Sequence, residues 1–169
     1  MITVPSPVTA RGLIFISSGH NLFSRQPIVA IRPDASGDIT PAKGQFSSQG
    51  VAWMHPRGGP YVTSPIAMED YLYISRDKGS LACYDALTGK TMYEKQKLGD
   101  RNTITASPIA GDSRIYIQAE NGECYIIKPG PEFEILAVNK LDEVFCASPV
   151  VSGGKLFLRG RKYLYCIGK

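Results

Sequence analysis

The chain has 169 residues, of which 43% are hydrophobic and 20% charged, and its formal net charge is +4. This balance is typical of a globular domain and excludes a disordered chain. The basic residues are scattered rather than gathered in a stripe, so nothing indicates nucleic-acid binding. No window approaches the ~18 consecutive apolar residues of a membrane-spanning helix, and residues 1–5 lack the basic and apolar regions of a secretory signal.

A Ser-Pro dipeptide recurs four times and divides the chain into repeats. It begins at Ser6, Ser64, Ser107 and Ser148, with spacings of 58, 43 and 41 residues, and a β-rich apolar run follows each time. These spacings are near the ~40 to 50 residues of a four-stranded propeller blade. The repeat therefore predicts an all-β fold: one partial β-propeller domain over residues 1–169, with blades at approximately 4–58, 61–98, 102–140 and 142–169.

Taken in chain order, the first unit predicts strands at 5–8, 13–16, 28–31 and 51–54, with a Gly-, Ser- and Pro-rich insertion from Pro33 to Gly50. The second unit predicts strands at 61–67, 71–75, 81–84 and 91–94. The third unit predicts strands at 106–110, 115–117, 124–127 and 133–136. Tight hairpin turns are expected at Gly79 and Gly122. The fourth unit predicts only three strands, at 146–151, 156–158 and 163–167, so its outer strand is missing.

This missing strand predicts a half-ring with two open flanks. Uncovered strand edges invite pairing with another chain. We therefore expect either a fragment of a longer protein or a subunit that closes by pairing with a second copy. Two rival all-β folds agree less well: a β-sandwich fits the strand spacing but not the recurring Ser-Pro, and a WD40 repeat would close with a Trp-Asp dipeptide, which is absent.

The four cysteines show no C-x-x-C spacing and no neighbouring histidine, which disfavours a zinc site. Each falls within an apolar strand-like run, so we expect them to be small buried hydrophobic residues. A disulfide between strands stays open, because it depends on the distance and orientation of the two residues. The cysteines are Cys83, Cys124, Cys146 and Cys166.

The run from Leu81 to Tyr93 resembles the repeat of pyrroloquinoline-quinone (PQQ)-type propellers, Ala-x-Asp-x-x-x-Gly-Lys-x-x-Trp. Asp85, Gly89 and Lys90 match in type and spacing, whereas cysteine replaces the alanine and Tyr93 replaces the tryptophan. The resemblance covers essentially the whole chain and is to the C-terminal half of an eight-bladed member. Such proteins usually act in the periplasm or are exported, which the resemblance therefore implies here.

The motif has a structural explanation. Asp85 is expected to open a turn by accepting backbone N–H groups, and Gly89 to take its left-handed position. An aromatic residue, Tyr93 or Trp53, would then pack between adjacent blades, with residues 133–135 near this position in the third unit. A structural motif of this kind assigns no activity.

Quinoprotein dehydrogenases, by this resemblance, would use a calcium ion beside the quinone, an aspartate base and often two adjacent cysteines. The chain has no adjacent cysteine pair and no dense carboxylate cluster. We therefore expect no catalytic residue, no metal and no cofactor, and a binding or scaffold module rather than an enzyme. The alternative is a fragment of a quinone-dependent dehydrogenase, with PQQ and calcium held by missing blades.

A binding role would place contacts at the loops of the ring face or at the open blade edges, and the partner would be a protein or a second copy. His55, Arg57 and Arg76 are the first candidates, because they lie in or beside the best-preserved repeat and arginine can grip carboxylate or phosphate. The same loops are expected to contain His20, Asn21, Asp77, Arg101, Glu120, Arg159 and Arg161.

Overall fold

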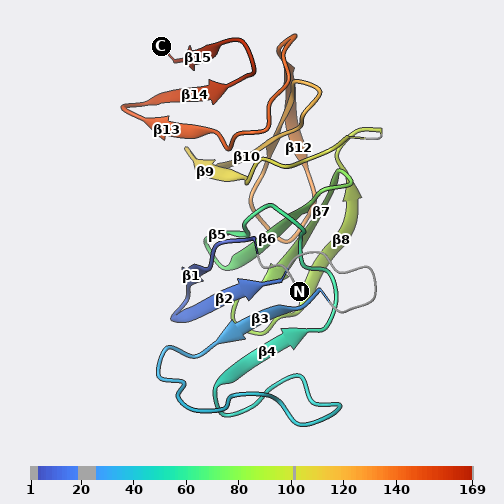
Figure 1. The fold of residues 1–169 in the computed structure, drawn as a ribbon, viewed down its shortest axis with the longest axis vertical. Coiled ribbons are helices and arrows are strands. Elements are labelled where there is room, and N and C mark those ends of the chain that lie inside the picture. Colours follow the sequence, from blue (N-terminus) through green and yellow to red (C-terminus); the bar gives the residue numbers. More distant parts are fainter. Residues whose placement is uncertain (1–3, 19–25, 101, 169) are drawn as a thin grey trace.

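The computed structural model describes residues 4–18, 26–100 and 102–168. This part of the chain contains only strands, arranged in four antiparallel sheets that follow one another along the molecule (Figure 1). We refer to the sheets as blades 1 to 4. The predicted partial β-propeller, with a last blade that lacks its outer strand, is confirmed.

Blades 1 to 3 each have four strands in chain order, and blade 4 has three. Blade 1 comprises β1 (Val8–Ala10), β2 (Leu13–Ser17), β3 (Ile28–Ile31) and β4 (Val51–His55); blade 2 comprises β5 (Ile66–Met68), β6 (Tyr71–Arg76), β7 (Ser80–Asp85) and β8 (Thr91–Lys97); blade 3 comprises β9 (Ile109–Gly111), β10 (Arg114–Gln118), β11 (Glu123–Ile127) and β12 (Ile135–Lys140); blade 4 comprises β13 (Val150–Ser152), β14 (Lys155–Arg159) and β15 (Leu164–Ile167).

The recurring Ser-Pro dipeptides form a hydrogen-bonded ladder that links successive blades. The backbone N–H of Ser6 donates to Oγ of Ser64, that of Ser64 to Oγ of Ser107, and that of Ser107 to Oγ of Ser148, each over 2.9 Å. Proline favours an extended backbone at the residue before it, so every serine approaches its neighbour in the same conformation. The ladder therefore runs head to tail through all four blades.

Apolar packing fills two of the three junctions between blades. At the first junction, Phe15 and Trp53 of blade 1 meet Leu72 and Ile74 of blade 2. At the second, Tyr73 of blade 2 belongs to a buried cluster with Ile115 and Ile117 of blade 3. Neither cluster includes a described residue of blade 4. Blade 4 instead leaves much apolar surface exposed, with Leu164 at 65%.

The prediction of four buried cysteines is correct for Cys83 and Cys124 and wrong for Cys146 and Cys166, which are exposed. The exposed pair belongs to blade 4 and to the linker leading into it, where no further sheet covers the surface. None of the four forms a disulfide. Among the described residues, no helix is long and apolar enough to cross a membrane.

Candidate functional site

The motif that resembles the PQQ-type repeat forms the turn between β7 and β8. Oδ1 of Asp85 accepts hydrogen bonds from the backbone N–H and the hydroxyl of Thr88, both over 2.8 Å. Gly89 takes a φ of 72° and its N–H donates to the carbonyl of Asp85. Lys90 is exposed at the end of this turn. The turn is thus held by its own hydrogen bonds.

Trp53 of blade 1 packs against this turn of blade 2. Its Nε1–H donates to the carbonyl of Ala86 over 2.9 Å, and the indole covers Gly89 so closely that an added Cβ would lie 2.6 Å from Cδ2. Tyr93 is the equivalent residue of blade 2, and its ring meets Phe133 of blade 3 with centroids 5.6 Å apart. One aromatic residue therefore seals each of the first two junctions.

The third junction lacks this aromatic residue. In blades 1, 2 and 3 the outer strand has a register shift at the same place, and the positions just past it are Trp53, Tyr93 and Ala137. The expectation that residues 133–135 lie near this position is wrong. Phe133 precedes β12 and serves the second junction instead, because the turn between β11 and β12 extends toward blade 2.

Two of the three candidate rim residues come together at the first junction. Nε2 of His55 lies 2.6 Å from the carbonyl oxygen of Gly89, and the centroid of the His55 ring lies 4.7 Å from that of Tyr84, with the two ring planes tilted by 43°. Arg76 donates to Tyr84 Oη over 3.2 Å and to Glu94 Oε1 over 2.9 Å. These polar groups are therefore engaged within the scaffold.

The remaining rim candidates do not converge. Arg57 is exposed, and its side chain has no polar contact among those the structure assigns to described residues. Asp77 accepts the N–H of Tyr61 over 3.3 Å, and Arg159 donates to the carbonyl of Tyr163 over 3.3 Å. Three further candidates, His20, Asn21 and Arg101, lie outside the described residues.

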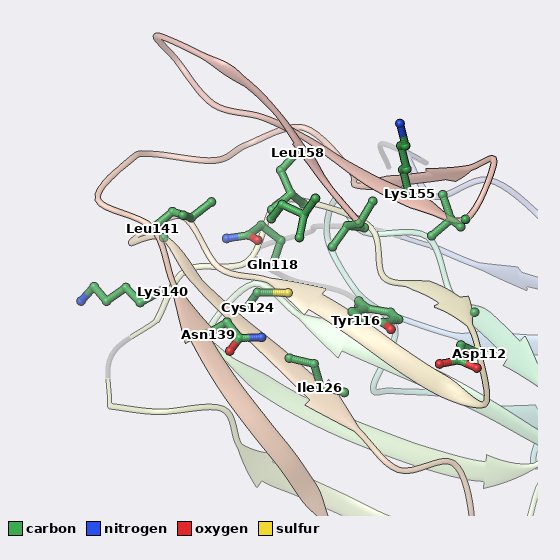
Figure 2. Close-up of a pocket in the computed structure, with 16 residues that line it drawn as sticks. Asp112, Tyr116, Gln118, Cys124, Ile126, Asn139, Lys140, Leu141, Lys155 and Leu158 are labelled. Carbon is green, nitrogen blue, oxygen red and sulfur yellow. The ribbon is translucent and has the colours of Figure 1, made fainter. Parts of the chain in front are cut away.

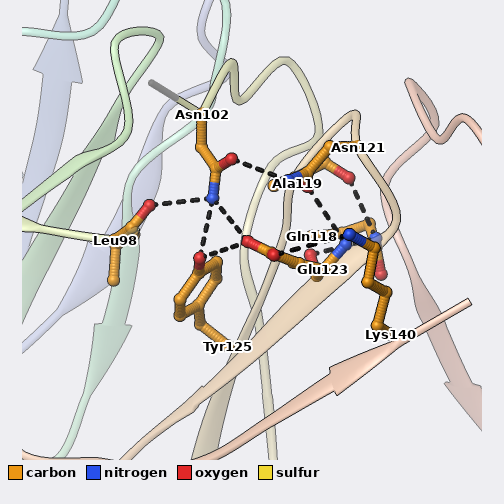
Figure 3. Close-up of polar contacts among 8 residues, drawn as sticks. All are labelled: Leu98, Asn102, Gln118, Ala119, Asn121, Glu123, Tyr125 and Lys140. Carbon is orange, nitrogen blue, oxygen red and sulfur yellow. Dashed lines mark hydrogen bonds and ion pairs between the residues drawn. The ribbon is translucent and has the colours of Figure 1, made fainter. Parts of the chain in front are cut away.

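A polar cluster that the sequence reasoning missed lies at the second junction (Figure 3). Nδ2 of Asn102, which is buried, donates to Glu123 Oε2 over 2.9 Å and to Tyr125 Oη over 2.7 Å, and Tyr125 donates to the same Glu123 oxygen over 2.5 Å. The hydrogen bonds from Tyr125 and Asn102 lower the pKa of Glu123 to about 2. The cluster fixes the linker between blades 2 and 3 against the turn into β11.

A groove lies between blades 3 and 4 (Figure 2). It has a volume of about 780 Å³. Tyr116, Cys124 and Ile126 form one wall, and Leu156 and Leu158 of β14 form the opposite wall. Gln118 lies in the first wall and is 1% exposed. Its Nε2 donates to the carbonyls of Ala119 and Glu123, whereas its buried Oε1 accepts no hydrogen bond in the structure.

A calcium ion beside a quinone would require several converging oxygen ligands. In the part of the chain that the structure describes, no three His, Cys, Asp or Glu side chains gather closely enough to hold a metal ion. The donor set therefore does not fit such a site, and we derive no chemical step through a metal or a quinone.

Comparison with solved structures agrees with this fold. BamB from Moraxella catarrhalis matches with a TM-score of 0.69 and 12% identity, over 96% of this chain and 41% of BamB. A europium-containing methanol dehydrogenase matches with a TM-score of 0.59 and 12% sequence identity, and the match covers 79% of this chain and 24% of the dehydrogenase. The computationally designed Ika8 protein matches with a TM-score of 0.66 and 8% sequence identity, and the match covers 97% of this chain and 46% of Ika8.

The chain thus spans less than half the length of these three proteins. No family model and no curated protein sequence matches it. Identities this low establish the fold alone. In that fold, the chain resembles the β-propellers with PQQ-like repeats.

Proposed function

We propose that this chain is a non-catalytic propeller module that binds a protein partner. The observation that carries the proposal is the apolar groove of about 780 Å³ between blades 3 and 4. The candidate polar residues argue in the same direction, since His55 contacts the Gly89 carbonyl of the next blade and Arg76 bonds Glu94 of its own blade, so both are already engaged within the scaffold.

The partner is a polypeptide that uses the open edge of the last blade. A second copy of this chain is one such partner, because the head-to-tail ladder gives each chain a first serine that can accept and a last serine that can donate. By the resemblance to PQQ-type propellers, we place the protein in the periplasm or outside the cell. Scaffold and binding roles in that compartment need no cofactor.

The proposal is tested by adding PQQ, calcium and a primary alcohol to the purified chain and following reduction of a redox dye. We expect no dye reduction above that of a protein-free control. Turnover above this control would overturn the non-catalytic assignment. Light scattering behind size-exclusion chromatography then gives the mass in solution, and a discrete dimer would identify the second copy as the partner.

A further inference from the structure

A hollow of about 710 Å³ lies where the turn between β6 and β7 meets the end of β8. Three of the residues that line it are lysines: Lys78 of the turn, and Lys95 and Lys97 of β8. The backbone N–H of Leu98 donates to the carbonyl of Gly79 over 2.8 Å, so the turn and the strand end lie side by side. The hollow therefore belongs to blade 2 and the linker after it, and it shares no lining residue with the groove between blades 3 and 4.

The lining of this hollow has an excess of positive charge. Its charged residues are the three lysines and one aspartate, Asp100, which gives three positive charges against one negative and a net charge of +2. None of the three lysines forms an ion pair with a described residue, whereas Lys128 pairs with Glu134 over 2.7 Å and Lys140 with Glu123 over 3.7 Å. Like charges gathered without a counter-charge repel one another, so an anion in the hollow is favoured.

Lys95 has a backbone conformation that lysine rarely adopts. Its φ is 56°, in the left-handed region, although it lies within β8. The other described non-glycine residues with positive φ all lie in the tight turns between the first and second strands of blades 1 to 3: Arg11, Glu69, Asp112 and Ser113. β8 bulges at Lys95, because the pairing shifts register between Leu81 and Cys83 and two residues of β8 then oppose one of β7. A bulge redirects a side chain, and glycine would take this φ without strain, so a lysine here indicates a use for its amino group.

Protection of the sheet edge explains only part of this pattern. Lysines on an outer strand discourage pairing with other chains, and β8 is the outer strand of blade 2. That role does not require Lys78, which lies in a turn, and a lysine in an ordinary extended conformation would meet it at position 95. The convergence of a turn, a bulge and a strand end on one hollow therefore favours a binding site.

We propose that this hollow binds a phosphate group. Ammonium groups bind phosphate as point charges, and the net charge of +2 on the lining balances the charge of about −1.5 to −2 that a phosphate ester carries at pH 7. The volume lies within the roughly 300 to 1,000 Å³ of small-molecule sites, which leaves room for the rest of a phosphorylated small molecule. This site is separate from the partner binding proposed at the last blade.

The test is a titration of the ¹⁵N-labelled whole chain, followed by NMR. Inorganic phosphate, glucose 6-phosphate and glucose are added separately at constant pH and ionic strength. We expect both phosphates to shift the amide signals of Gly79 and Gly99, which line the hollow, and not those of Gly37 and Gly44, which do not. Glucose should shift none of the four. Both orders of affinity support the site: tighter binding of glucose 6-phosphate identifies a phosphate ester as the ligand, and tighter binding of inorganic phosphate identifies the free ion.

The variants change one charge at a time. Lys95→Gln and Lys97→Gln should each weaken phosphate binding about twofold to fivefold, as the loss of one exposed ion pair implies. Asp100→Asn should tighten it by a similar factor, because a negative charge leaves the lining. Lys90→Gln is the matched control and should leave binding unchanged, since Lys90 is exposed at the other end of β8 and does not line the hollow. Lys95→Gly should weaken binding as Lys95→Gln does, but unfold at a higher urea concentration than Lys95→Gln, because glycine removes the backbone strain.

Unshifted Gly79 and Gly99 signals in both phosphate titrations would overturn the inference. An equal loss of affinity in Lys95→Gln, Lys97→Gln and Lys90→Gln would overturn it as well, because phosphate would then respond only to the net charge of the chain. So would a Lys95→Gly variant that is more stable and binds phosphate unchanged, since the lysine would then serve only the strand edge. The dye-reduction assay and the mass in solution are independent of these results, so this inference and the proposed function fail separately.

Discussion

Replacing Gly89 by alanine is expected to destabilise the chain by about 2 to 5 kcal/mol, through two separable effects. Gly89 has a φ of 72°, in the left-handed region, where a Cβ costs roughly 1 to 2 kcal/mol. The added Cβ would also lie 2.6 Å from Cδ2 of Trp53. Displacing a packed ring of this kind adds about 1 to 3 kcal/mol.

The assay is equilibrium unfolding in urea, followed in a double-mutant cycle with Trp53→Ala. Trp53→Ala alone should cost about 3 to 5 kcal/mol, because the indole is 7% exposed. In its absence Gly89→Ala should cost only the backbone strain, about 1 to 2 kcal/mol, because the ring it would strike is gone. The control is Gly37→Ala: Gly37 has a φ of 68° and no atom within 4 Å of its added Cβ.

Two results would refute this reasoning. If Gly89→Ala and Gly37→Ala destabilise the chain equally, the contact with Trp53 contributes nothing beyond backbone strain. If the effects of Gly89→Ala and Trp53→Ala simply add, the indole does not seal the first junction through this turn.

Three further outcomes are expected. Ser64→Ala removes the acceptor for Ser6 N–H and should lower the free energy of unfolding by about 1 kcal/mol, whereas Ser36→Ala, at an exposed position, should not. The folded pKa of Glu123, about 2, lies below its ordinary 4.5, so its stabilisation is present above pH 4.5 and is lost as pH falls toward 2; Glu123→Gln should flatten the loss of melting temperature over that range. Burial raises the pKa of the Cys83 thiol to about 12 and that of Cys124 to about 11, so mass spectrometry should find both unmodified by iodoacetamide after Cys146 and Cys166 have reacted; equal rates at all four would contradict the fold.

The repeat was readable from the sequence because Ser-Pro has a role that each blade needs. The repeat predicted four blades, the last without an outer strand, and the structure has three sheets of four strands and one of three. The role itself was not readable. The hydroxyls of Ser64, Ser107 and Ser148 each accept from a backbone N–H that is 41 to 58 residues away, and such pairing exists only once the blades lie side by side. The recurring Ser-Pro dipeptide therefore identifies the repeat, but it does not reveal the hydrogen bond between blades that each serine makes.

The rim candidates show the opposite case. Residue type and loop position placed His55 and Arg76 at a surface where they could meet a ligand. In the structure both turn toward Tyr84, since the junction offers the Gly89 carbonyl and the Glu94 carboxylate as acceptors. The sequence shows which side-chain donors and acceptors exist, but not which of them are already used within the fold. Side-chain direction depends on the strands packed around a residue, those of the next blade for His55 and those of its own blade for Arg76, and no local pattern describes them.

Ala137 could not have been found by counting along the sequence, because the predicted outer strand of the third unit begins at residue 133, whereas β12 begins at Ile135. Trp53, Tyr93 and Ala137 each stand two residues after the first residue of the outer strand, at Val51, Thr91 and Ile135. The prediction instead followed chemistry and assigned the nearest aromatic, Phe133, to the position. The error is informative, because Phe133 packs against Tyr93 at the second junction and therefore does not cover the third. Where the first two junctions have Trp53 and Tyr93, the third has the exposed Ala137, so the series of aromatic residues between blades stops before blade 4.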